Sequence, residues 1–379
     1  MPRKRLLGLG LLLMLCLLGG FGYRIAHQSA LNHDLFNEVS RSDPEQVRTL
    51  LIQGADSNAR IDTAGGPSFQ RLIDMLLRRP STGTSSCPLA KAMDTAVWDA
   101  NHMKVVQFLL EHHANPDIRT LDGSPAPLAA LAAGSKERLL KLFLEHGANP
   151  NTLDRTGTSL LMNAVNLRKS SCVEILLKYG AQPEVANAQG DTALMWAAYH
   201  GDVKSIALLL AAGVDVNRKN RSNQTALMYA LASNDAGEKE TSKTVERLVD
   251  ADADVNVQDS KGCTPFLYAL LLRHPTSDLM LTKGGDVQRA IPWHVSNLQL
   301  DIQIKTGAFS MSLSRGCTCT PGVTPLMLAA QAHDVGLVHK MLARGAEVNA
   351  QDIGGHTALF YAEEDPKIVG PLKHAGLRQ

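Results

Sequence analysis

One short pattern recurs along the chain at an interval near 33 residues. It joins the apolar end of a helix to a glycine and a polar turn, as in FLEHGANPN (143–151), LLKYGAQPE (176–184) and LLAAGVDVN (209–217). The glycine position, which holds His or Asp in two copies, recurs at residues 54, 113, 147, 180, 213, 252, 284, 345 and 376. A fixed period of this length predicts stacked supersecondary units, none of which can bury its apolar face alone.

A second signature follows the glycine position by about twelve residues and begins with threonine. Examples are TALMWAAYHGD from Thr192, TALMYALA from Thr225 and TPFLYALL from Thr264, and the same signature recurs after the third long interval as TPLMLAAQAHD from Thr324. A threonine here can cap the exposed N–H groups of a short helix, and paired alanines let a second helix approach closely. The second helix has apolar residues at helical spacing and ends at the next glycine, which predicts a left-handed C-cap at Gly213.

Together these two signatures resemble the ankyrin repeat, whose helix–turn–helix–hairpin-loop unit has this period and a T-P-L-H-x-A opening. The resemblance covers about residues 31–379 and eight to nine copies. It implies an all-α repeat solenoid, an ankyrin helix-turn-helix stack, whose polar first and last units act as caps. The chain departs from the family at the histidine of the opening, which is replaced by Met195, Met228, Leu267, Met327 and Phe360.

Residues 1–30 differ from the repeats and are interpreted as a signal-anchor, transmembrane or signal segment. A basic cluster from Arg3 to Arg5 precedes an uncharged, leucine-rich run from Leu6 to Tyr23. As a helix this run would be roughly 27 Å long, close to the hydrocarbon thickness of about 30 Å. We favour an uncleaved anchor with the repeats outside the cytoplasm, most simply in a bacterial periplasm, and export after signal cleavage is the alternative.

Three intervals exceed the repeat period, and they predict insertions near residues 60–86, 234–242 and 288–320. The first contains an amphipathic pattern from Phe69 to Leu77, which predicts a helix. The second is polar and predicts a longer loop between two helices. These insertions are the features that distinguish the chain from a regular array.

The third insertion changes the period from helical to alternating. Apolar residues fall on every second position, first at Leu298, Leu300, Ile302 and Ile304, and then at Phe309, Met311 and Leu313. This pattern predicts an inserted β-hairpin that lengthens one finger, the loop joining successive repeats, by about 28 residues and projects from the array. One face must pack on the stack or on a partner, because an isolated two-stranded hairpin is marginal in water. The alternative is a poorly ordered insertion.

Charge and motifs argue against catalysis and against nucleic acid. The 38 Lys and Arg balance 37 Asp and Glu, so no global field attracts a polyanion. Phosphate-binding glycine loops, metal-binding helices and nucleophile elbows are not found at the required spacing, so no catalytic, cofactor-binding or metal residue is predicted and the chain is not expected to be an enzyme. The cysteines have no zinc-like spacing, and whether Cys263, Cys317 and Cys319 form a disulfide stays open.

The resemblance implies that a protein partner is held by the finger tips and by the first helices along the concave side. The matching candidates in this sequence are Arg155, Gln189, Trp196, Tyr199, His200, Arg221, Tyr229, Lys261 and Tyr268. Aromatic residues are over-represented in binding hot spots, which favours Trp196, Tyr229 and Tyr268 as contacts. The alternative for this aromatic column is packing between repeats.

The sequence thus predicts a non-catalytic ankyrin scaffold for protein–protein interaction. We expect it to be tethered to a membrane by its N-terminal segment and to bind a protein of unknown identity on its concave face and elongated finger. Two alternatives remain: an immunity-type inhibitor of a toxin or enzyme in the periplasm, and a structural envelope protein without a selective partner.

Overall fold

A computed structural model describes most of the chain. The described residues are 23–62, 85–94, 99–120, 123–132, 136–233, 237–292, 298–306, 309–317 and 321–376. The apolar run that precedes Tyr23 and the predicted helix from Phe69 to Leu77 lie outside them. Within these ranges no helix combines the length and the apolar character that crossing a bilayer requires. The chain divides into two compact units, residues 1–152 and 153–379.

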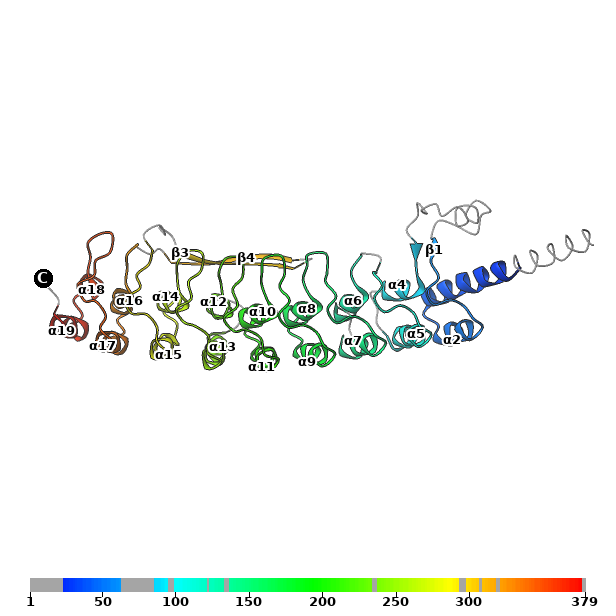
Figure 1. Ribbon diagram of the computed structural model, residues 1–379, viewed down its shortest axis with the longest axis horizontal. Helices are drawn as coiled ribbons and strands as arrows, with labels where there is room; N and C mark the ends of the chain where they lie inside the picture. The colour runs from blue at the N-terminus through cyan, green and yellow to red at the C-terminus, as the bar shows by residue number, and fades with distance from the viewer. Residues whose placement is uncertain are drawn as a thin grey trace, which may run out of the picture. The chain divides into compact units, whose positions relative to one another are not determined.

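The first unit begins with helical residues 23–41 and continues as helix pairs (Figure 1). A short strand pair, β1 (Ile61–Asp62) with β2 (Ser85–Ser86), closes the base of the first insertion. The helices of this unit are α2 (Pro44–Ile52), α4 (Pro88–Met93), α5 (Ala100–Glu111), α6 (Ala126–Ala132) and α7 (Lys136–Glu145).

The second unit repeats one helix pair along its length. The pairs are α8 (Leu160–Asn166) with α9 (Ser170–Lys178), α10 (Ala193–His200) with α11 (Val203–Ala211), α12 (Ala226–Ala232) with α13 (Glu238–Asp250), α14 (Pro265–Leu271) with α15 (Ser277–Thr282), α16 (Pro325–Gln331) with α17 (Val335–Ala343), and α18 (Ala358–Tyr361) with α19 (Pro366–His374). Within this unit the first helices form one layer and the second helices another (Figure 1). The predicted all-α repeat solenoid is confirmed.

Helix boundaries follow the local chemistry of the two signatures. The hydroxyl of Thr192 accepts a hydrogen bond from the backbone N–H of Met195, and Thr324 caps α16 in the same way. Gly213 has φ +80°, the left-handed conformation predicted for the residue that ends α11. In that helix Ile206 and Leu209 are fully buried. The capping residues and the apolar stripe therefore set the helices of each repeat locally. Stacking of neighbouring repeats then buries the apolar stripe.

Side-chain amides join successive repeats at the turn that follows each second helix. Asn217 is an example, and its side chain makes two hydrogen bonds to the next repeat. Its amide nitrogen donates to the carbonyl of Asp252 (3.1 Å), and its amide oxygen accepts from the N–H of Asp254 (2.7 Å). In the first unit Asn58 bonds His113 and Asn115 in the same way, across the first insertion. The two repeats on either side of that insertion are therefore direct neighbours in the stack.

The same bonds span the third insertion. The side chain of Gln288 donates to the carbonyl of Gly345 (2.6 Å) and accepts from the N–H of Glu347 (3.1 Å). The repeats before and after the third insertion are therefore direct neighbours in the stack. The predicted loop at 234–242 is partly wrong, because α13 already begins at Glu238 and has 13 residues, against nine in α11. Glu238 and Glu240 lie in its first turn, where negative charge stabilises a helix.

The predicted hairpin is present as two antiparallel strands, β3 (Leu298–Thr306) and β4 (Phe309–Cys317). The register pairs Ile302 with Leu313 and Ile304 with Met311, so these positions share one face of the sheet. Cys317 is the last residue of β4, and Cys319 lies outside the described residues, so the question of a disulfide there stays open.

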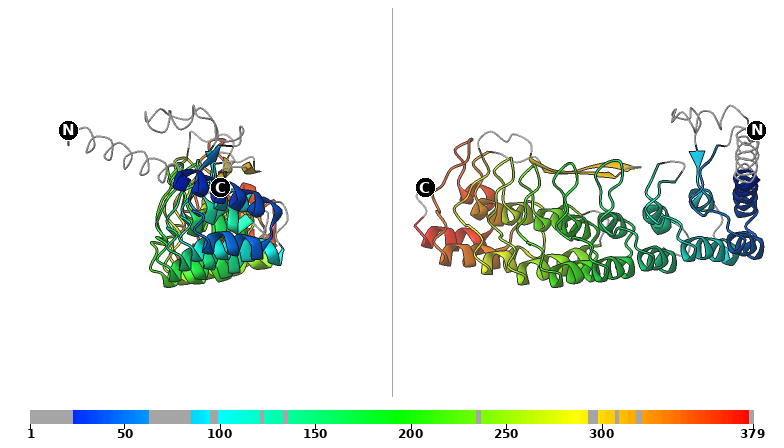
Figure 2. Two further views of the ribbon diagram at one scale, coloured as in Figure 1. Left: turned by 90° about the vertical axis from the view of Figure 1, so that its right-hand side faces the viewer. Right: turned by 45° about the vertical axis from the view of Figure 1, so that its right-hand side comes forward.

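The hairpin does not project from the array as we had predicted. Both strands lie against α12, and the views show them running along the first helices of the second unit (Figure 2). The C-terminal residues of α12 and its cap, Ala232 and Ser233, are buried, whereas Gln331 at the equivalent end of α16 is exposed. A two-stranded sheet cannot bury enough apolar surface by itself, which explains why it packs on the stack.

Candidate protein-binding surface

Five fingers of the second unit are each built around one Asp or Asn side chain. Its Oδ1 accepts hydrogen bonds from the backbone N–H groups two and four residues further on, at 2.8 to 2.9 Å. The residues in this position are Asp154, Asn187, Asn220, Asp259 and Asp352. Short polar side chains stabilise tight turns in this manner. The fingers thus share one rigid frame.

Backbone hydrogen bonds align neighbouring fingers. The N–H of Arg221 donates to the carbonyl of Gln189 (2.9 Å), and the N–H of Ser260 donates to the carbonyl of Ser222 (2.9 Å). Gly190 permits this approach, because it has φ +83° and a Cβ there would lie 3.0 Å from the backbone nitrogen of Arg221. The tips of consecutive fingers therefore form an ordered row.

Tyrosines of the first helices tie the fingers to the stack. The Tyr229 hydroxyl donates to Oδ1 of Asp191 (2.7 Å), which also accepts from the amide of Asn220 (2.9 Å). Burial raises the pKa of Tyr229 well above its ordinary value, and the nearby carboxylate of Asp191 raises it further. Tyr268 donates instead to Asp259, the turn-forming residue of its own finger (2.6 Å). These tyrosines hold finger and helix together.

The aromatic candidates predicted from the sequence are not at the surface. Trp196 and Tyr199 are 0% exposed, Tyr229 is 1% exposed and Tyr268 is 2% exposed. The prediction that these aromatic residues contact a partner is therefore wrong. We assign them to packing between repeats. Their neighbours in the stack cover them, which no pattern within a single repeat could show.

The polar candidates lie differently. Arg155 and Arg221 are exposed at finger tips, and Gln189 and Lys261 are half-buried there. His200 is half-buried at the end of α10, where its Nε2 lies 3.2 Å from Oδ1 of Asn166. The finger bonds bring Gln189 and Arg221 into one row, whereas His200 belongs to the helix layer.

Sequence reasoning missed three exposed tip residues: Ala188, Lys219 and Ser260. Ala188 and Ser260 could have been found from their position, because each directly follows a turn-forming Asn or Asp. That position holds Arg155, Ala188, Arg221, Ser260 and Ile353 in successive described fingers, whereas the turn-forming residue itself hardly changes.

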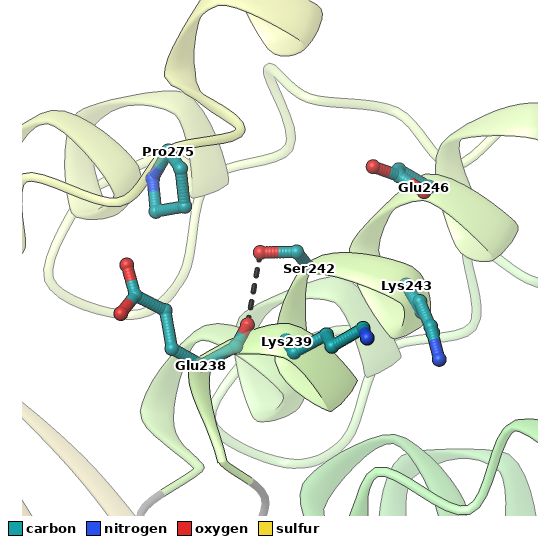
Figure 3. A pocket seen from close by; sticks show the side chains of 6 residues that line it. All are labelled: Glu238, Lys239, Ser242, Lys243, Glu246 and Pro275. Carbon is teal, nitrogen blue, oxygen red and sulfur yellow. Dashed lines mark hydrogen bonds between the residues drawn. The ribbon is translucent and has the colours of Figure 1, made fainter.

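An open depression of about 610 Å³ lies on the second-helix side, between α13 and Pro275 (Figure 3). Its other lining residues are Glu238, Lys239, Ser242, Lys243 and Glu246. The Ser242 hydroxyl donates to the backbone carbonyl of Glu238 (2.9 Å), as an ordinary helix serine does. The lysine and glutamate side chains do not converge on one point. In the described part of the chain no cluster of His, Cys, Asp and Glu could hold a metal ion.

Family models support the repeat assignment. The model for ankyrin repeats in three copies matches residues 93–187, 126–220 and 168–243, and the single ankyrin repeat model matches residues 322–353. The chain is an ankyrin-repeat protein. The third insertion lies between these two blocks of matches. No curated protein matches the chain in a sequence search. Ankyrin-repeat proteins are generally non-catalytic scaffolds for protein–protein interaction, and this one has their repeats.

Proposed function

We propose that this ankyrin-repeat protein is a non-catalytic scaffold that binds one protein partner through the finger row of its second unit. One observation carries the proposal. The hydrogen-bonded frame is the same from finger to finger, but the exposed residue that follows each frame residue differs. A purely structural array needs the frame and places no demand on the tips, whereas recognition of one partner requires tips of different chemistry.

The β3–β4 hairpin belongs to this proposed surface. It lies against α12, on the layer of first helices that is continuous with the fingers. A partner seated on the finger row would therefore meet the hairpin as part of the same face. Docking on α12 gives the hairpin a fixed position, which reduces the entropy that binding has to overcome.

We expect the fingers of the second unit to cross-link to a single protein in the native cell. In the two test variants, a photoreactive amino acid replaces Ala188 or Ser222, each at a finger tip. In the two matched controls it replaces Lys204 or Lys243, which are exposed on second helices. The expected result is one adduct of the same mass from both tip positions and none from the controls. Equal labelling from tips and controls, or no adduct from either tip, would contradict the proposal.

The proposed location is the outer side of a membrane, with residues 1–30 as the tether. The support is the basic cluster from Arg3 to Arg5 followed by the apolar run, a charge arrangement that keeps the short N-terminal side in the cytoplasm. A reporter enzyme that is active only outside the cytoplasm, fused after Gln379, should be active. A silent reporter in that fusion, together with an active cytoplasmic reporter, would reverse the proposed topology.

A further inference from the structure

We propose that the finger row of the second unit binds an acidic, carboxylate-rich segment of its protein partner. This inference rests on the proposed function and adds the chemistry of the partner. Its basis is a separation of charge within the fingers that the balanced composition of the chain conceals.

Cations occupy the exposed tips of these fingers. Arg155, Lys219 and Arg221 are exposed, and Lys261 is half-buried. Within the described ranges, no carboxylate oxygen lies within ion-pair distance of Arg155, Lys219 or Arg221. Arg218, one residue before Lys219, does have such a contact, because its guanidinium lies 2.7 Å from Glu184 at the base of the finger.

Carboxylates of the same fingers point inward. Asp259 and Asp191 are 6% and 0% exposed, and their oxygens accept hydrogen bonds from the hydroxyls of Tyr268 and Tyr229. Asp154 accepts from the backbone N–H groups of its own turn. In the described residues 153–158, 186–191, 218–224 and 257–263 no exposed residue is acidic. A partner approaching the tips therefore meets hydrogen-bond donors of positive charge first.

The backbone bonds between fingers hold Arg221 and Lys261 in sequence along one row, since Arg221 is bonded to Gln189 and Ser260 to Ser222. An array of cations on a rigid frame complements a segment with carboxylates spaced along it, and such complementarity favours both specificity and fast association. Protein is favoured over nucleic acid, because the whole chain carries a formal charge of only +1, whereas binding to phosphate backbones is dominated by cationic contacts.

The test measures binding of labelled probes to the full chain by fluorescence anisotropy at an ionic strength of about 0.05 M, where screening is weak. The probes are a short peptide of alternating glutamate and glycine, its lysine–glycine counterpart, and a single-stranded DNA of the same charge as the first peptide. One variant combines Arg155→Glu, Lys219→Glu and Arg221→Glu. The matched control combines Lys204→Glu, Lys239→Glu and Lys243→Glu, which makes the same charge change at exposed positions of second helices.

The expected result is binding of the glutamate peptide in preference to the other probes. Its affinity should fall on the order of tenfold or more in the tip variant and by less than about twofold in the control. Equal losses in the two variants, tighter binding of DNA, or no preference for the glutamate peptide would overturn the inference. Thermal unfolding followed by circular dichroism verifies that both variants remain folded.

A second measurement separates this inference from the proposed function. If the tip variant still gives the same cross-linked adduct in cells at wild-type yield, a partner is bound at the fingers but not through its acidic groups. If no adduct forms even in the native chain while the glutamate peptide binds, the charged row is present but the proposed function fails.

Discussion

Trp196→Ala is expected to lower the free energy of unfolding by about 3–5 kcal/mol, because the indole is fully buried in α10 and its loss leaves a cavity between repeats. Chemical denaturation followed by far-ultraviolet circular dichroism measures the change. Amide hydrogen exchange in α8, α10 and α12 should locate it in the second unit.

Arg221→Ala is the matched control for this substitution, because its side chain is exposed at a finger tip. It should change stability by no more than about 0.5 kcal/mol and weaken partner binding instead. The pair separates packing from recognition. If Trp196→Ala kept full stability and abolished cross-linking to the partner, the assignment of the aromatic column to packing would be wrong.

Asp191→Ala is expected to destabilise the second unit by about 3 kcal/mol. The substitution removes the acceptor shared by Tyr229 and Asn220, and it leaves the buried Tyr229 hydroxyl without this charged partner. Each buried polar group that loses its partner costs about 1–3 kcal/mol. Equilibrium unfolding in urea is the measurement, with hydrogen exchange of residues 186–191 and 218–224 to show whether the fingers loosen.

Tyr229→Phe serves as the comparison, because it removes the donor and keeps the packing of the ring. Asp191 keeps the amide of Asn220 as a partner in this variant, so the expected cost is smaller, about 1–2 kcal/mol. A loss in Tyr229→Phe equal to or greater than that in Asp191→Ala would show that the carboxylate is not the centre of the network.

Local patterns account for the parts of the fold that were predicted well. Threonine at a helix start and glycine at a helix end act within a few residues, so Thr192 and Gly213 could be assigned without knowledge of their neighbours. The alternation of apolar and polar residues from Leu298 to Ile304 is also a local pattern, because successive side chains of a pleated strand point to opposite faces.

The candidate site was predicted less well, since accessibility is not a local property. Trp196 and Tyr199 belong to residue types that favour interfaces, but their exposure depends on what packs against them. Arg155 and Arg221 were identified because a finger tip is exposed wherever the turn occurs. Lys219 was missed because its neighbour Arg218 is equally basic, and only the contact of Arg218 with Glu184 distinguishes the two.

The repeat period, the threonine and glycine signals at the helix ends and the presence of a hairpin were determined by the sequence alone, because each depends on interactions between residues near one another in the chain. Tertiary structure decided that the hairpin packs on α12, that the aromatic column is buried and that the finger carboxylates face inward. These outcomes depend on contacts between different repeats. Such contacts set burial and hydrogen bonding, and therefore which residues remain for a partner.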